Sequence, residues 1–171
     1  MAQTYSLIAT DVTFTAQKCM LGVFNGSGSG RVLRIYRVTA LNNQITAVAG
    51  QVTNLELRRL TAGSSGTTVT PFKHDTNNES FPGQIVVSHN MTTTSTTTLH
   101  RVFWSTNEPV ADLISIDAFE TIPELCDMWN AVSDPNTEPL VCPEGYGIGL
   151  FNTGATSGTC DIHFEVTLAN T

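Results

Sequence analysis

Residues 160–168, CDIHFEVTL, give the clearest indication of the fold of this chain. Apolar and polar side chains alternate strictly along the nine positions. One face holds Cys160, Ile162, Phe164, Val166 and Leu168, and the other holds Asp161, His163, Glu165 and Thr167. Such alternation indicates a β-strand with one buried face and one face turned to water or to a partner.

Similar sequence patterns predict β-strands over most of the rest of the chain. Further strands are predicted at Tyr5–Thr15, Cys19–Phe24, Arg31–Leu41, Val52–Leu60, Thr67–Phe72, Gln84–His89, Leu99–Ser105, Leu140–Val141 and Tyr146–Phe151. Turn-forming stretches such as NGSGSG (25–30) and AGSSG (62–66) separate them. We therefore expect an all-β fold, a single antiparallel β-sandwich or jelly-roll domain over residues 1–171, with about eight to ten short strands.

One helix is expected to interrupt the strands. Ile122, Leu125, Cys126 and Trp129 recur at helical spacing, and Thr121 and Pro123 suit a helix start. The helix would lie within a long loop excursion at about residues 107–139. Excursions of that length in a compact β domain are usually functional or packed against a neighbour.

Charge is scarce and unevenly placed. Only 13% of the 171 residues are charged, and Lys18 and Lys73 are the two lysines, while threonine is abundant. Residues 1–101 carry a net charge of +4, whereas residues 102–171 contain eleven acids and no base. The overall charge of −7 disfavours nucleic acid as a partner. No apolar run is long enough for a membrane span, and the first ten residues lack the basic region of a secretory signal.

The charge split has two interpretations. The two halves could interleave and neutralise each other, or the protein could present basic and acidic surfaces to its neighbours. In the second case, we expect a basic set of contact residues to meet an acidic neighbour and an acidic set to meet a basic or polar one. The basic set is Arg31, Arg34, Arg37, Arg58 and Arg59; the acidic set is Asp112, Asp117, Glu120, Glu124 and Asp127.

No motif predicts catalysis, a metal site or a cofactor. The cysteines at positions 19, 126, 142 and 160 are scattered and are expected to be buried, reduced thiols. The histidines show no HxH or HExxH spacing, although a metal between His100 and His163 stays open if their strands are neighbours. The GYGIG stretch at 145–149 lacks the strand–loop–helix context of a dinucleotide site, and its glycine face would let something approach closely. We expect no enzyme.

The tract MTTTSTTT (91–98) is polar on both faces and is predicted to form an exposed edge or a protruding hairpin. Covering threonine at an interface costs less side-chain entropy than covering lysine, and interfaces are depleted in lysine. A surface rich in Thr, Ser and Asn therefore favours a protein that works inside an assembly.

The stretch Arg31–Asp75, together with LVCPEGYGIGLFN (140–152), resembles small β-sandwich or jelly-roll auxiliary proteins of tailed-phage virions. This resemblance implies a cement or decoration protein that bridges capsid subunits. Its partners would be the major capsid protein and copies of itself, and it would reside in the virion after assembly in the host cytoplasm. The alternative is a lectin-like or receptor-binding module, for example of a phage tail, with Trp104, Trp129 and Tyr146 as candidate contact residues.

Overall fold

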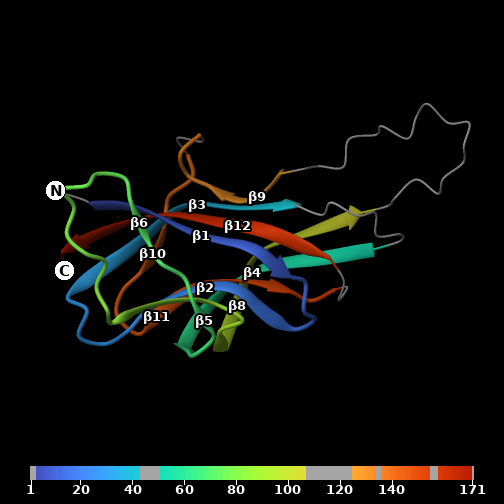
Figure 1. Ribbon diagram of the computed structural model, residues 1–171, viewed down its shortest axis with the longest axis horizontal. Helices are drawn as coiled ribbons and strands as arrows, with labels where there is room; N and C mark the ends of the chain where they lie inside the picture. Colours follow the sequence, from blue (N-terminus) through green and yellow to red (C-terminus); the bar gives the residue numbers. More distant parts are fainter. Residues whose placement is uncertain (1–2, 43–50, 107–124, 134–135, 155–157, 171) are drawn as a thin grey trace, which may run out of the picture.

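Two antiparallel β-sheets stack in the computed structural model, which describes residues 3–42, 51–106, 125–133, 136–154 and 158–170 (Figure 1). Sheet A has the order β10-β3-β12-β1-β6, with β9 also paired to β3, and sheet B has the order β5-β7-β2-β11-β4-β8. The strands of sheet A are β1 (Gln3–Thr13), β3 (Arg31–Asn42), β6 (Phe72–Lys73), β9 (Leu125–Asn130), β10 (Leu140–Cys142) and β12 (Thr159–Asn170). The strands of sheet B are β2 (Lys18–Asn25), β4 (Gln51–Ser64), β5 (Thr67–Thr68), β7 (Ile85–His89), β8 (Thr92–Thr106) and β11 (Tyr146–Asn152).

The strand pairing is nested from the outside of the chain inwards. β1 pairs with β12, β2 with β11, β3 with β10, and β4 with β8. A long hairpin that is rolled up in this way gives two sheets in which early and late strands alternate. That order is the jelly roll, so the predicted all-β class is confirmed.

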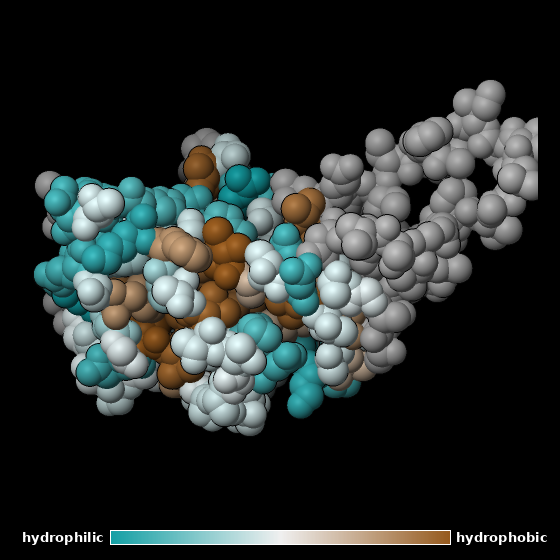
Figure 2. Space-filling view, in the orientation of Figure 1, coloured by the Kyte–Doolittle hydropathy of each residue, from teal (hydrophilic) through white to brown (hydrophobic). Residues whose placement is uncertain are grey.

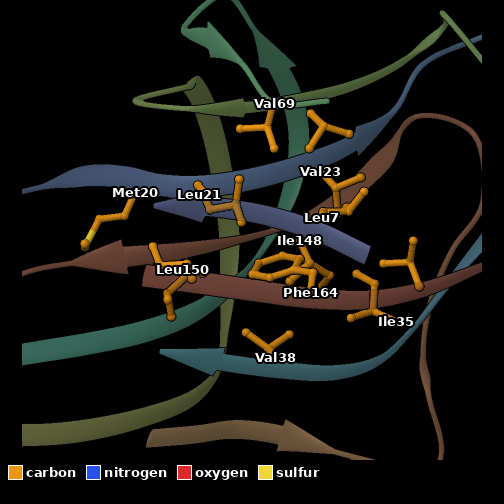
Figure 3. Packing of buried hydrophobic residues seen from close by; sticks show 14 of the residues in the cluster. Leu7, Met20, Leu21, Val23, Ile35, Val38, Val69, Ile148, Leu150 and Phe164 are labelled. Atoms are coloured by element: carbon orange, nitrogen blue, oxygen red, sulfur yellow. The ribbon is translucent and has the colours of Figure 1, made fainter. Parts of the chain in front are cut away.

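The core lies between the two sheets and follows the period-two pattern of the sequence. All five apolar residues of the 160–168 stretch are buried in it. Leu7, Ile35 and Phe164 from sheet A face Leu21 and Ile148 from sheet B (Figure 3). In β1, β3 and β12 the alternation therefore places one face of the strand in the core and the other on the outer face of sheet A.

Sheet B also buries part of its outer face. Cys19, Leu60, Met91 and Phe151 form a second apolar cluster. The register between β4 and β8 shifts at Leu57/Arg58, Arg59/Leu60 and Leu60/Ala62, and bulges of this kind bend and twist a strand pair. Both faces of the central strands β2 and β11 are consequently buried.

The predicted helix is wrong for the part of it that the structure describes. Residues 125–130 form strand β9, which pairs with β3 from Leu41↔Leu125 to Arg37↔Asn130. Cys126, Met128 and Trp129 pack towards the core while Asp127 is exposed, and a bulge at Met128 interrupts the period of two. Pairing with the edge of β3 supplies every second backbone group with a partner and outweighs the helical spacing. Ile122 and the rest of 107–124 lie outside the described residues.

The excursion predicted at about 107–139 is correspondingly shorter, because β9 joins sheet A in the middle of it. In the parts of the chain that the structure describes, no helix has the length and apolarity needed to cross a membrane.

Candidate interaction surfaces

The outer face of sheet A exposes large apolar side chains. Phe72 is 56% exposed, Val141 42%, Ile8 39% and Leu41 38%. Their register partners show that they share one face: Phe72 pairs with Ser6, Ile8 with His163, Leu41 with Asp161 and Val141 with Arg34. We call this outer surface of sheet A the sheet A face. Figure 2 views the molecule from the side, in the orientation of Figure 1, and apolar residues (brown) gather there in the middle, between more hydrophilic ones.

A row of register partners that includes the charged residues Glu165 and Arg37 crosses the same face. Phe72, Ser6, Glu165, Arg37 and Asn130 are successive register partners on β6, β1, β12, β3 and β9. Arg37 Nε lies 3.3 Å from Asp127 Oδ1, and both side chains are about 40% exposed. Arg34 is exposed nearer the start of β3, and Asp127 is exposed beside Thr39, further along β3. The face therefore has a basic end and an acidic end.

Two histidines meet one serine hydroxyl at the centre of the sheet A face. His74 Nε2 lies 2.7 Å and His163 Nε2 lies 3.0 Å from Ser6 Oγ. Because a hydroxyl has one proton, Ser6 can donate to at most one of the two rings. Burial lowers the pKa of His163, Glu165 raises it, and Arg37 and His74 lower it, with a net decrease. The neutral form of His163 is thus favoured.

The long strand β8 provides the second surface. It is the last strand of sheet B, so one of its edges has no hydrogen-bonded neighbour among the described residues. Its first half, Thr92–Thr98, is mostly exposed, which confirms the predicted edge position of the threonine tract. No lysine or proline interrupts Thr92–Thr106, although these residues commonly protect edge strands from pairing.

The predicted arginines do not form a single surface. Arg31, Arg34 and Arg37 lie on β3 in sheet A, whereas Arg58 and Arg59 lie on β4 in sheet B. Arg31 Nη2 lies 2.6 Å from Glu79 Oε2, and Arg59 donates to the carbonyl oxygen of Val141 at 3.0 Å. Arg34 and Arg37 are the members of the set that belong to the sheet A face.

Arg58 takes part in a charge cluster around a buried carboxylate. Glu56 is 2% exposed, and its Oε2 lies 2.6 Å from Arg58 Nη2. Arg101 pairs with the other carboxylate oxygen, Oε1. Thr98 Oγ1 donates a hydrogen bond to Oε2 at 3.3 Å. Arg58 also lies 4.7 Å above the ring of Phe151. Burial raises the pKa of Glu56, but the hydrogen bond from Arg58 and the charges of both arginines outweigh it, and the pKa is lowered.

These pairs bear on the two interpretations of the charge split. Arg31–Glu79, Arg58–Glu56 and Arg101–Glu56 all lie within residues 1–101, and Arg37–Asp127 joins the two halves. Much of the basic charge is thus neutralised inside its own half. Of the acidic set, Asp127 lies on the sheet A face, and Asp112, Asp117, Glu120 and Glu124 lie outside the described residues.

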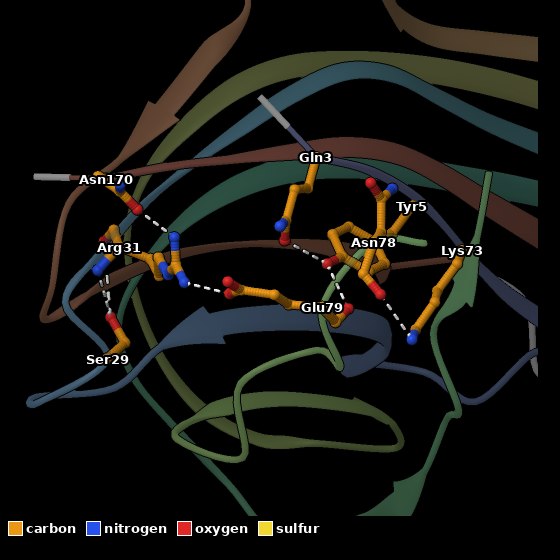
Figure 4. Close-up of polar contacts among 8 residues, drawn as sticks. All are labelled: Gln3, Tyr5, Ser29, Arg31, Lys73, Asn78, Glu79 and Asn170. Atoms are coloured by element: carbon orange, nitrogen blue, oxygen red, sulfur yellow. Dashed lines mark hydrogen bonds and ion pairs between the residues drawn. The ribbon is translucent and has the colours of Figure 1, made fainter. Parts of the chain in front are cut away.

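A polar network joins the two ends of the chain to its loops (Figure 4). The hydroxyl of Tyr5 lies 2.8 Å from Gln3 Oε1 and 2.8 Å from the carbonyl oxygen of Glu79. The Tyr5 ring also meets Phe81 edge-on, with 5.0 Å between centroids. Arg31 bridges Glu79 and Asn170, so strand β12 is held to the insertion between β4 and β8. These contacts hold both ends of the described chain and the insertion together at this end of the sandwich.

The NGSGSG loop between β2 and β3, predicted as a turn-forming stretch, is held by a carboxylate. Glu144 accepts the N–H groups of Gly28 at 3.0 Å and Gly30 at 2.7 Å. Buried Asn25 donates to the carbonyl oxygens of Arg31 and Cys142 and accepts from Ser29. The pKa of Glu144 is lowered, chiefly by the N–H groups of Gly28 and Gly30.

Cysteines 19, 142 and 160 are buried and free, as predicted, and Cys126 is free and half-buried. Burial raises the pKa of Cys19 to about 12 and that of Cys142 to about 11. His100 lies on β8 in sheet B and His163 on β12 in sheet A, so their strands are not neighbours. In the described parts of the chain, no three side chains suited to a metal come together.

The glycine face of β11 is approached by side chains of the protein itself. A Cβ atom on Gly149 would lie 2.7 Å from Cys19 Sγ and 3.0 Å from the Phe151 ring. The GYGIG stretch thus provides space for the second apolar cluster of sheet B. Of the aromatic candidates, Trp129 packs against the core and Tyr146 is 42% exposed. The side chain of Trp104 lies outside the described part of the structure.

A groove of about 310 Å³ opens beside β5 and β7. It is lined by Val69, Phe81, Ile85 and neighbouring residues, none of which has an ionisable side chain. The groove therefore provides apolar contact but no group for acid–base chemistry.

The sheet A face could not be predicted from the sequence. Alternation marks Ile8 and Leu41 only as members of their strands, and Phe72 follows a proline in an irregular stretch. Ser6, His74 and His163 come together only through the pairing of β1 with both β6 and β12. Comparisons with family models, with curated proteins and with solved structures found no match to this chain.

Proposed function

We propose that this protein is a structural virion protein, a capsid cement or decoration protein. It stabilises a phage shell by bridging capsid subunits through non-covalent contacts. Its partners are the major capsid protein and copies of itself, and it acts in the virion after assembly in the host cytoplasm.

One observation carries the proposal: two uncovered surfaces lie on opposite sheets of the sandwich. A protein that bridges others needs at least two contact surfaces, and the sheet A face and the β8 edge meet this need. The sheet A face offers apolar side chains, each able to contribute about 1.5–3 kcal/mol when fully buried. The β8 edge offers backbone groups for pairing with a strand of a neighbour.

The jelly-roll order and the side-chain chemistry support this proposal further. Jelly rolls are frequent in viral capsid and lectin domains, although a fold alone does not define a function. The exposed threonines of β8 carry little side-chain entropy to lose on contact.

The test is reconstitution with shells that lack the protein, assembled from the major capsid protein of the same genome. We expect the purified chain to co-sediment with these shells and to occupy regular lattice positions in electron micrographs. A Thr96→Lys variant puts a charge on the β8 edge and should bind less well, while Thr68→Lys on β5, at the opposite edge of sheet B, should bind normally.

Failure of the wild-type protein to bind such shells would overturn the proposal. A glycan array separates it from the alternative, a lectin-like or receptor-binding module. Specific glycan binding without shell binding would favour that alternative and exclude the cement function.

A further inference from the structure

From the sheet A face we infer that two copies of this chain form a symmetric dimer, in which their sheet A faces pack against each other. The inference assigns a surface to the self-contact of the proposed function. It is tested on the purified protein without any shell, so that the two proposals fail separately.

The first argument is that apolar exposure is concentrated on one face. Ile8, Leu41, Phe72 and Val141 all point outward from sheet A, and exposed Val132 follows β9 at the margin of the same sheet. On sheet B the corresponding outer positions are covered by the cluster of Cys19, Leu60, Met91 and Phe151. An apolar patch rimmed by polar groups is typical of a protein interface.

The second argument is charge complementarity, which identifies the partner as a second copy. Exposed Arg34 lies towards one end of β3, and exposed Asp127 lies beside Thr39 towards the other, with Arg37 between them. A two-fold axis that crosses the strands at the Arg37 row turns one copy end to end relative to the other. Arg34 of each copy then faces Asp127 of its partner, so this contact forms twice, as a two-fold interface requires. Within the row on the axis, each Arg37 lies one strand away from Glu165 of the other copy, because the two residues are register partners.

The same axis brings Phe72, the most exposed apolar side chain on the strands of sheet A, against itself. Phe72 belongs to the row of register partners that contains Ser6, Glu165 and Arg37, so it lies close to the axis. Phe72 lies on the edge strand β6, so this contact would close the interface at one side of sheet A; aromatic residues and arginine are enriched at interfaces.

The size of the face suits a dimer at the low end of stable interfaces. Five strand positions about 4.8 Å apart and about eight residues of about 3.3 Å each cover roughly 600 Å² per copy. Two copies would bury about 1,200 Å², the lower limit for specific interfaces. We therefore expect a dimer that dissociates on dilution.

Sedimentation velocity over a dilution series of the full-length protein tests the inference. The wild-type chain should shift from dimer to monomer as it is diluted. Phe72→Ser should weaken the dimer at least about tenfold, whereas Tyr146→Ser, which changes an exposed aromatic residue of sheet B, should leave it unchanged.

A charge exchange tests the orientation. Arg34→Glu should weaken the dimer about tenfold, and adding Asp127→Arg in the same chain should recover most of the loss. Circular dichroism melts show whether each variant is folded. A wild-type chain that stays monomeric at high concentration would overturn the inference, as would equal effects of the Phe72 and Tyr146 variants or no recovery by the charge exchange.

Discussion

The carboxylate of Glu144 accepts the backbone N–H of Gly30 at 2.7 Å. It also accepts the N–H of Gly28, so one side chain before β11 fixes the conformation of the loop between β2 and β3. The pKa of Glu144 is lowered in the folded protein because these N–H groups stabilise the charged form.

Replacement of Glu144 by Gln should loosen this loop. A carboxyl group whose pKa is lowered on folding stabilises the folded state above its unfolded pKa, and that stabilisation is lost as the pH falls through the folded pKa. We expect the protection factors of the Gly28 and Gly30 amides, which compare their exchange with that of an unstructured chain at the same pH, to fall in Glu144→Gln at neutral pH and in the wild-type protein on acidification. Nuclear magnetic resonance measures both, and Glu138→Gln, a carboxyl group in the connection between β9 and β10, is the control. Unchanged exchange in Glu144→Gln would contradict the prediction.

Acid should destabilise the fold through His163. Its folded pKa lies below its unfolded value of 6.5, so the unfolded chain binds more protons between these two values. Stability should therefore fall as the pH is lowered from 6.5 through the folded pKa. Urea unfolding across this range should show a smaller decrease for His163→Gln than for the wild type, with His100→Gln behaving like the wild type. An equal decrease in the stability of all three proteins would contradict the prediction, because groups other than His163 would then cause the pH dependence.

Glu56→Gln should destabilise the protein by about 2 kcal/mol. The substitution removes the negative charge that Arg58 and Arg101 share and leaves their guanidinium groups facing a neutral amide. Arg101 is half exposed and can turn to water, which limits the cost. The melting temperature reports the loss, and Glu165→Gln on the more exposed sheet A face should have a smaller effect. A Glu56 variant as stable as the wild type would show that the cluster does not stabilise the fold.

Gly149→Ala should cost about 1–3 kcal/mol, because the new methyl group would meet Cys19 Sγ at 2.7 Å and the Phe151 ring at 3.0 Å in a packed cluster. Gly83 is the matched control, since a Cβ atom there would have no neighbour within 4 Å. Gly83→Ala should therefore unfold at nearly the wild-type temperature. Equal stability of the two variants would mean that β11 can move away from Cys19.

The strands were predictable because one side of each strand faces the core. In β12, alternation and burial agree at all five apolar positions, and β1 and β3 follow the same rule. In β9 the spacing of Cys126 and Trp129 fits a helix, and the strand brings both side chains towards the core only through the bulge at Met128. The free edge of β3 favours the strand, and that edge is a property of the whole sheet.

The candidate surfaces were less predictable because they depend on which strands become neighbours. The threonine tract identified the β8 edge directly, since a segment polar on both faces cannot lie inside a sheet. The sheet A face combines Phe72, Ile8 and Arg34 from three separated segments, and no local pattern connects them. The five arginines were grouped by type, but pairing with Glu56 and Glu79 occupies two of them.

The pairing of β1 with β12 also determines when sheet A can be completed during synthesis of the chain. Strand β12 lies between β1 and β3, so the middle of sheet A is formed by the first and the last strands of the domain. A nascent chain carries β1 and β3 long before β12 is synthesised, and contacts of such high sequence separation form slowly. The sheet A face is therefore complete only after β12 has been synthesised, and a chain that lacks β12 cannot form the dimer proposed above.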